Sequence, residues 1–402
     1  MSIFVSIAAY RDPELVKTIA SALAEAENPE QLTFGICWQR GKEDGDYAAM
    51  HQVMEDPRFT VKEFDYEESQ GPCWARSIAN SLIKAEDYFL QIDSHMRFAE
   101  GWDLILVDML DRCPSDKAVI STYPSTYNST TEWRSNEFWH MIPSNKDDSG
   151  VMRFCPVVRK ERRLRASMYL AAGFIFSRRQ FAIDVPYDPD LYFHGEEISL
   201  SVRAWTRGYD FFLPDKRVVW HEYSGGKRIR HWVDHSCRKE TEFPFAVLDA
   251  RCKAKVRRLI SQREVGIMGL GTVRTLDEYE NHSGVLFAKN FISPKAREGA
   301  DVPIYTDSSW KEIPVFRFKG TLDWSERRED IEAFEPDFLA VFFSGKRHDM
   351  SCADGVPVER KVQRVGYSVQ DRFLIWPYRV KPLLWGRKYT VKLQGDMVGH
   401  EF

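Results

Sequence analysis

A short apolar segment that ends in three polar residues most constrains how this chain can fold. Residues 88–92 read YFLQI and run directly into Asp93-Ser94-His95. This is the pattern of a buried parallel strand whose carboxyl end opens into a polar crevice, and open α/β sheets bind ligands at that end. Because side chains two apart along a strand share a face, Asp93 and His95 are expected to converge. Taken alone, the tripeptide is more typical of an ordinary turn.

The rest of the first 120 residues alternates between strand and helix patterns. Such an alternation predicts a doubly wound α/β fold with a mostly parallel sheet. Strands are expected at 3–9, 32–38, 60–64, 88–93 and 118–122, and helices at 14–26, 47–54, 71–83 and 102–110.

The composition indicates two domains and no general attraction to nucleic acid. The chain has 402 residues, 43% hydrophobic and 29% charged, and a formal net charge of −4, so an anionic ligand would need local basic groups. Its seven cysteines are scattered without CxxC spacing, which argues against a disulfide framework or a structural zinc site. With no predicted transmembrane segment and a start that resembles a strand more than a signal peptide, the protein is expected to be cytoplasmic.

Residues 124–165 break the alternation and are expected to form an irregular insert beside the crevice. Such inserts often serve as binding loops or lids. The end of the insert is basic, with Arg159, Lys160, Arg162, Arg163 and Arg165. These residues could bind phosphates, or they could form a charged surface exposed to solvent.

Three further features follow the insert. Gly173 interrupts an apolar run, which indicates a bulge or a close backbone approach. Glu196 and Glu197 open a predicted helix, and His221 ends a short predicted strand at 218–220.

The character of the chain changes near residue 300, where helical patterns give way to short strands. We therefore predict an α/β domain over 1–299 and a β-rich domain of unknown role over 300–402. Strands are expected at 315–319, 338–343, 366–369, 372–376 and 388–393.

Several of these motifs, in this order, resemble nucleotide-sugar glycosyltransferases with the GT-A fold. The segments IFVSIAAYRDPEL, GPCWARSIANSLIKAEDYFLQIDSHMRFAEGWD and GLGTVRTLDEYENHSG resemble the hydroxyproline-directed polypeptide N-acetylglucosaminyltransferases (glycosyltransferase family 60) and their bacterial relatives. A more distant similarity, to the polypeptide N-acetylgalactosaminyltransferases, rests on Asp93-Ser94-His95, residues 171–173, the run HGEE at 194–197 and the run from Ile198 to Trp205. The resemblance covers about residues 2–290.

The resemblance implies a retaining, metal-dependent enzyme that moves N-acetylglucosamine from UDP-GlcNAc to a hydroxyl group of a polypeptide or a glycan. It implies that Asp93, His95 and His221 bind Mn²⁺ or Mg²⁺, and this mixed oxygen and nitrogen set is compatible with manganese. It implies Glu196 and Glu197 as the catalytic candidates, although either could instead complement the helix dipole. The implied contacts to the donor are Ala9, Tyr10, Arg11, Arg76, Asp93, Ser94 and Gly173.

Other interpretations remain open from the sequence. His221 could be a satisfied structural histidine, and Arg76 a charge on a helix surface. The chain could be a catalytically silent protein that binds nucleotide sugars or glycans, with a lectin-like C-terminal module, or a metallohydrolase of nucleotide sugars. A Rossmann dehydrogenase is disfavoured because no GxGxxG follows the first strand. Neither the acceptor nor the oligomeric state is indicated.

Overall fold

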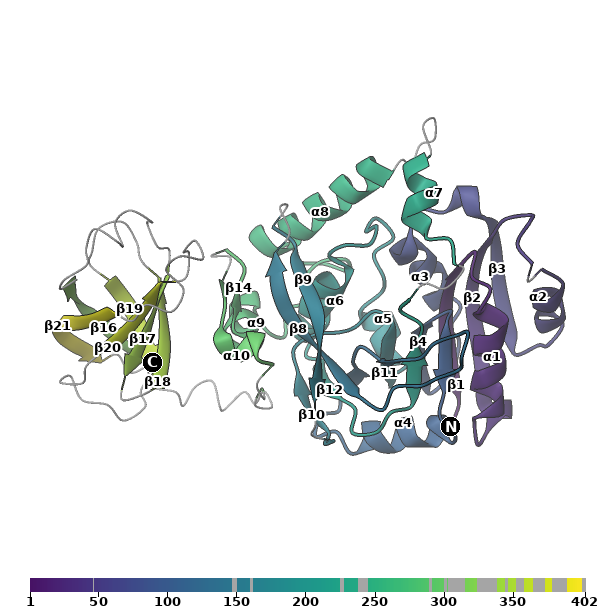
Figure 1. Ribbon diagram of the computed structural model, residues 1–402, viewed down its shortest axis with the longest axis horizontal. Coiled ribbons are helices and arrows are strands. Elements are labelled where there is room, and N and C mark those ends of the chain that lie inside the picture. The colour runs from purple at the N-terminus through teal and green to yellow at the C-terminus, as the bar shows by residue number, and fades with distance from the viewer. Residues whose placement is uncertain are drawn as a thin grey trace. The chain divides into compact units, whose positions relative to one another are not determined.

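The structure, a computed structural model, falls into two compact units, Met1–Ile304 and Tyr305–Phe402 (Figure 1). In the first unit it describes residues 1–45, 47–146, 150–159, 162–224, 228–237, 245–288, 291–299 and 302, and in the second it describes the strands given below. None of the helices in these ranges combines the length and the apolar character needed to cross a bilayer.

The first unit is built on an eight-stranded sheet of order β10-β12-β6-β11-β4-β1-β2-β3. Four neighbouring strands run parallel, β1 (Ile3–Tyr10), β2 (Leu32–Arg40), β3 (Phe59–Asp65) and β4 (Tyr88–Asp93). β6 (Ala118–Ser121) and β12 (Asp210–Leu213) are also parallel to each other. β11 (Phe174–Arg178) runs antiparallel to β4 and β6, and β10 (Arg165–Ser167) antiparallel to β12. The predicted α/β class with a mostly parallel sheet is confirmed.

Helices cover both faces of this sheet because successive strand side chains point to opposite faces. One face of β1, including Val5 and Ile7, is buried with α1 (Leu15–Ala24) and α4 (Trp102–Asp111). The other face packs against α3 (Pro72–Asn80). Gly35 fits between the layers on that face, since a Cβ there would lie 2.2 Å from the ring of Phe4.

A small three-stranded sheet brings His221 to the end of β4. β13 (Val219–His221) lies between β5 (Met96–Phe98) and β7 (Ser125–Thr126), and its last residue, His221, pairs with Met96. His221 therefore lies beside His95, the residue before Met96. α6 (Glu196–Thr206) begins at the same edge after Gly195, whose φ of 97° is left-handed.

The insert predicted to be irregular contains a β-hairpin, so this prediction was wrong. β8 (Phe138–Lys146) and β9 (Met152–Arg159) pair antiparallel, with Trp139 opposite Val158. Most side chains of β9 are only partly buried. A ribbon without one buried face lacks the strict apolar and polar alternation by which strands are recognised in a sequence.

The remaining elements are short or lie on the outside of the first unit. Its other described α-helices are α2 (Tyr47–Met54), α5 (Gln180–Asp184), α7 (His231–Cys237), α8 (Phe245–Ser261), α9 (Leu276–Ser283) and α10 (Pro294–Arg297), and its short 3-10 helices are η1 (Pro29–Gln31) and η2 (Tyr66–Glu68). A two-stranded sheet joins β14 (Val285–Leu286) and β15 (Phe291–Ile292).

The second unit contains one six-stranded sheet of order β18-β17-β20-β21-β16-β19, with antiparallel pairing throughout the described ladders. Its strands are β16 (Val315–Asp323), β17 (Phe338–Phe343), β18 (Lys346–Ser351), β19 (Val358–Gln363), β20 (Phe373–Pro377) and β21 (Tyr389–Gly399). The strand predicted at 366–369 lies outside the described residues.

Candidate active site

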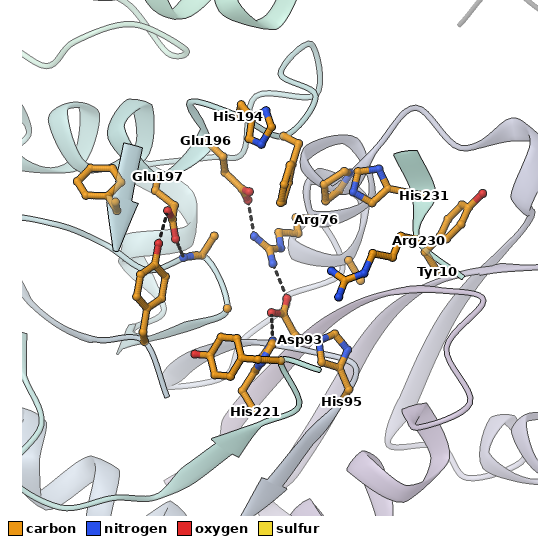
Figure 2. Close-up of a pocket in the computed structure, with 18 of the residues that line it drawn as sticks. Tyr10, Arg76, Asp93, His95, His194, Glu196, Glu197, His221, Arg230 and His231 are labelled. Carbon is orange, nitrogen blue, oxygen red and sulfur yellow. Dashed lines mark hydrogen bonds and ion pairs between the residues drawn. The ribbon is translucent and has the colours of Figure 1, made fainter. Parts of the chain in front are cut away.

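A pocket of about 700 Å³ opens at the carboxyl ends of β1 and β4. It collects nine of the residues that the sequence singled out, and Figure 2 shows how those that it labels face one another. The predicted residues that line it are Tyr10, Arg76, Asp93, Ser94, His95, Gly173, Glu196, Glu197 and His221.

Three of these side chains form a group that could hold a metal ion. One ligand atom from each of Asp93, His95 and His221 lies within 4.8 Å of the other two. The Nε2 of His221 lies 3.0 Å from Asp93 Oδ2 and 2.9 Å from His95 Nε2. Among the residues that the structure describes, no other histidine, cysteine or acidic trio converges in this way.

The protonation states of this group suit a cation. Burial, together with the neighbouring His95, lowers the pKa of His221 to about 4, against the opposing effect of Asp93. Burial would raise the pKa of Asp93, but Arg76 and His221 hold it well below its ordinary value. At neutral pH the site therefore offers an ionised carboxylate and a neutral imidazole, the forms that bind metals, and the donor set fits manganese.

Arg76 lies between two carboxylates and is buried, so it is not a helix-surface charge. Its Nη2 donates to Asp93 Oδ1 at 2.5 Å, and its Nη1 donates to Glu196 Oε1. α3 places it there because Cys73, Arg76 and Asn80 share the buried side of the helix. Figure 2 shows Glu196, Arg76, Asp93 and His221 joined in a row.

Glu196 and Glu197 occupy different environments although they are adjacent. Burial raises the pKa of Glu196 while Arg76 opposes this rise. Glu197 instead accepts hydrogen bonds from the Tyr123 hydroxyl at 2.8 Å and from the backbone nitrogen of Ala172 at 3.3 Å. Burial raises the pKa of Glu197 to about 7. Glu196 is thus paired with the Arg76 guanidinium, whereas Glu197 can gain or lose a proton near neutral pH.

A Glu197→Gln variant is expected to gain stability relative to the wild type as the pH rises from about 5 to about 8. Burial raises the folded-state pKa of Glu197 to about 7 from an ordinary value of 4.5. The carboxyl group therefore contributes stability at low pH that is lost as the pH rises through about 7. Glutamine does not ionise. In urea unfolding, the free energy of unfolding of Glu197→Gln relative to the wild type should rise by about 1–2 kcal/mol between about pH 5 and pH 8. The gain is limited to this size because the side chain is only partly buried and solvent screens its charge. An equal difference in unfolding free energy between the variant and the wild type at pH 5 and at pH 8 would contradict the raised pKa of Glu197.

Gly173 fulfils the prediction of a close approach. A Cβ at this position would lie 2.7 Å from Asp93 Oδ2. Any larger residue would therefore displace the carboxylate of the candidate metal site. Contact between Gly173 and a donor sugar stays a prediction.

The predicted donor contacts at the end of β1 are not all in the pocket. Tyr10 lines it, and its hydroxyl donates to Asp234 Oδ2 of α7 at 2.8 Å. Arg11 forms ion pairs with Asp234 at 3.2 Å and with Asp44 at 3.1 Å. It does not line the pocket. Ala9 is fully buried in the core of the sheet. Contact of these residues with a donor stays a prediction, which for Ala9 could involve only its backbone.

Several residues of the pocket were not singled out from the sequence. Arg228 and Arg230 approach from the segment before α7. His231 and Trp232 approach from the first turn of α7. Besides Tyr10, the aromatic residues of the pocket wall are Tyr123, Trp139, Phe154, Phe193, Tyr223 and Trp232. The sequence signal for the two arginines was their position shortly after His221, which ends a predicted strand.

The described residues of the basic run at the end of the insert lie outside this pocket. Arg159 Nε donates to His140 Nδ1 at 3.0 Å, and Arg165 Nη2 lies 3.2 Å from the same nitrogen. Arg162 stacks over the ring of Phe138. These contacts do not support a phosphate-binding role, and Lys160 lies outside the described residues.

The chain is similar to known proteins in sequence and in structure. A family model described as Glycosyltransferase (GlcNAc) matches residues 2–57 and 42–289. No curated protein matches the chain. A crystal structure of GalNAc-T7 with UDP, GalNAc and Mn²⁺ is similar with a TM-score of 0.47 and 14% identity, over 98% of this chain and 72% of that chain. A crystal structure of S. aureus TarS 1-349 is similar with a TM-score of 0.38 and 11% identity, over 66% of this chain and 74% of that chain.

Proposed function

This chain belongs to the glycosyltransferase (GlcNAc) family, and on that premise we propose that it transfers N-acetylglucosamine from UDP-GlcNAc to a hydroxyl group of a polypeptide or glycan, with retention of the anomeric configuration. The observation that carries the proposal is the convergence of Asp93, His95 and His221 in a pocket that also holds two glutamates. Membership of glycosyltransferase family 60 is part of the proposal.

Asp93, His95 and His221 are the residues that would hold Mn²⁺ or Mg²⁺. Such an ion, when bound, neutralises the negative charge that develops on a nucleoside diphosphate leaving group. Arg228 and Arg230 line the same pocket, and we assign them to the phosphates, because arginine is well suited to bind phosphate oxygens.

The remaining charged groups act on the sugar and the acceptor. We assign Glu196, which Arg76 holds in place, to the hydroxyl groups of the donor sugar. Glu197, with a pKa near 7, orients the acceptor hydroxyl. The acceptor oxygen attacks the anomeric carbon on the face from which the diphosphate departs. The new C–O bond forms as the bond to phosphate breaks, and the departing phosphate takes the hydroxyl proton.

The activity is tested with UDP-GlcNAc and Mn²⁺. We expect slow release of UDP without an acceptor, little release from other UDP-sugars, and an α-linked product by NMR once an acceptor is found by mass spectrometry of modified lysate components. The Glu196→Gln variant should bind UDP-GlcNAc but lose at least about 100-fold in transfer, a typical loss when a transition-state hydrogen bond is removed.

Other outcomes of this experiment would favour other functions. Binding of UDP-GlcNAc without release of UDP or transfer would favour a catalytically silent binding protein. Release of UDP that no acceptor diverts from free sugar would favour a nucleotide-sugar hydrolase. Wild-type turnover by the Glu196→Gln variant would remove Glu196 from the catalytic machinery.

We extend the proposal to the organisation and location of the chain. Residues 1–299 form the catalytic domain, and the β-rich residues 300–402 act with the insert at 124–165 in choosing the acceptor. The insert contributes Trp139 and Phe154 to the pocket wall, which supports its part in this choice. A cytoplasmic location remains a prediction.

A further inference from the structure

We propose that Asp12 is a positioning residue of this site, which holds His95 in the ring tautomer that leaves its Nε2 free to bind a cation. Asp12 stands just before Pro13 and the helix predicted at 14–26, a position typical of a residue that caps a helix. The inference rests on the metal site of the proposed function, but the state of the His95 ring can be measured without any metal.

The carboxylate of Asp12 is buried and accepts from several donors at once. It lies in the loop between β1 and α1 and is 3% exposed. Its Oδ1 accepts from the backbone nitrogen of Glu14 at 3.0 Å. Its Oδ2 accepts from the Ser94 hydroxyl at 2.6 Å and lies 2.7 Å from Nδ1 of His95. Both oxygens are therefore committed as acceptors.

This arrangement decides which nitrogen of His95 carries the proton. An ionised carboxylate can only accept, so the Nδ1 that faces it must be the donor. A neutral imidazole has one N–H, so Nε2 of His95 keeps its lone pair. That atom lies 2.9 Å from Nε2 of His221, inside the group that could hold a cation. Carboxylates that orient metal-binding histidines in this way are common.

The helix that follows Asp12, α1, is tied to the turn that carries His95 by a second set of contacts. The Thr18 hydroxyl in α1 donates to the carbonyl oxygen of Ser94 at 2.8 Å and accepts from the backbone nitrogen of Met96 at 2.8 Å. These contacts bracket His95 on both sides. Arg228 Nη1 lies 3.6 Å from Asp12 Oδ2 and balances its charge. Asp12 and His95 are thus held in a fixed geometry.

Asparagine at position 12 is a sharp test because it has one acceptor oxygen where aspartate has two. The backbone N–H of Glu14 can only donate, so the asparagine oxygen should remain there. The amide NH₂ would then face Nδ1 of His95, which can serve as its acceptor only in the other tautomer. In that tautomer Nε2 of His95 carries the proton, and this nitrogen cannot bind a cation until the proton is lost.

We expect the Asp12→Asn variant to bind Mn²⁺ about 10–100-fold more weakly than the wild type, the usual range for such partners of metal ligands. Isothermal titration with Mn²⁺ alone measures this. Asp103→Asn is the matched control. Asp103 is also buried and accepts from the backbone nitrogens of Glu27 and Asn28, both at 3.0 Å, but it does not line the pocket. Its variant should lose stability and keep the wild-type Mn²⁺ affinity.

NMR of ¹⁵N-histidine-labelled protein without metal reads the tautomer directly, with the His95 signal assigned by its loss in His95→Gln. We expect a proton on Nδ1 in the wild type and on Nε2 in Asp12→Asn. A wild-type His95 protonated on Nε2, or equal Mn²⁺ affinity in Asp12→Asn and the wild type, would overturn the inference. Absence of Mn²⁺ binding by the wild type would instead refute the metal site itself, and the tautomer would still show whether Asp12 controls His95.

Discussion

An Arg76→Met variant is expected to lose about 3–5 kcal/mol of unfolding free energy, the usual cost of removing one partner from a buried ion pair. Arg76 is 6% exposed and is the cation between Asp93, at 2.5 Å, and Glu196. Methionine replaces much of the apolar stem but not the charge. Both carboxylates would then remain in a buried position without their shared partner, which disfavours their ionised forms.

Urea unfolding in the presence of a chelator measures this loss without compensation from a bound ion. The double variant Arg76→Met/Glu196→Gln should recover part of the loss, because one of the two uncompensated carboxylates is gone. Arg112→Met is the matched control. Arg112 also pairs with two carboxylates, those of Asp108 and Asp215, but is 41% exposed, so its replacement should cost about 1 kcal/mol or less.

The loss should also depend on pH. Without Arg76, the pKa values of Asp93 and Glu196 in the folded state should rise. A carboxyl group with a raised folded-state pKa contributes stability at low pH and loses it as the pH rises through that pKa. The deficit of Arg76→Met should therefore shrink from about pH 8 towards pH 5. An equal loss in Arg76→Met and Arg112→Met would contradict the role of Arg76 as the buried counter-ion.

The sequence predicted the parts of the site that follow from periodicity along one strand. Asp93 and His95 were expected to converge because they are two residues apart at the end of β4, and the structure places both in one pocket. The approach of His221 could not be derived in this way. It depends on the pairing of β13 with β5, a strand of three residues, which is too short to carry a periodic signal.

Residues that act through long-range contacts were also missed. Asp12 fits the common pattern of a carboxylate at the start of a helix, and nothing local indicates that its second oxygen faces His95, 83 positions later. Arg228 and Arg230 enter the pocket from a segment with only basic character in sequence. The partner of Asp12 is distant in the chain, so no local pattern could have revealed it, whereas the two arginines follow closely after His221 in the sequence.

A His221→Ala variant is expected to bind Mn²⁺ at least about 100-fold more weakly than the wild type, because replacing a partner of a metal ligand alone commonly costs 10–100-fold. The alternative from the sequence was a structural histidine, and this variant distinguishes the two roles. Its Nε2 faces Asp93 and His95, while its buried Nδ1 has no hydrogen-bond partner among the described residues. The polar contacts of its ring are therefore made to Asp93 and His95, the other two candidate ligands.

Stability measured with and without metal separates a ligand from a structural residue. At Mn²⁺ of 100 times its Kd, the wild type should gain about 2.7 kcal/mol of unfolding free energy. With a 100-fold weaker site, His221→Ala should gain only about 0.4 kcal/mol at the same concentration. His140→Ala is the matched control, since His140 is 5% exposed and lies outside the pocket. It should lose stability equally with and without Mn²⁺. If His221→Ala kept the full Mn²⁺-dependent gain, His221 would not be a ligand, and the cation would have to be held by Asp93 and His95 alone.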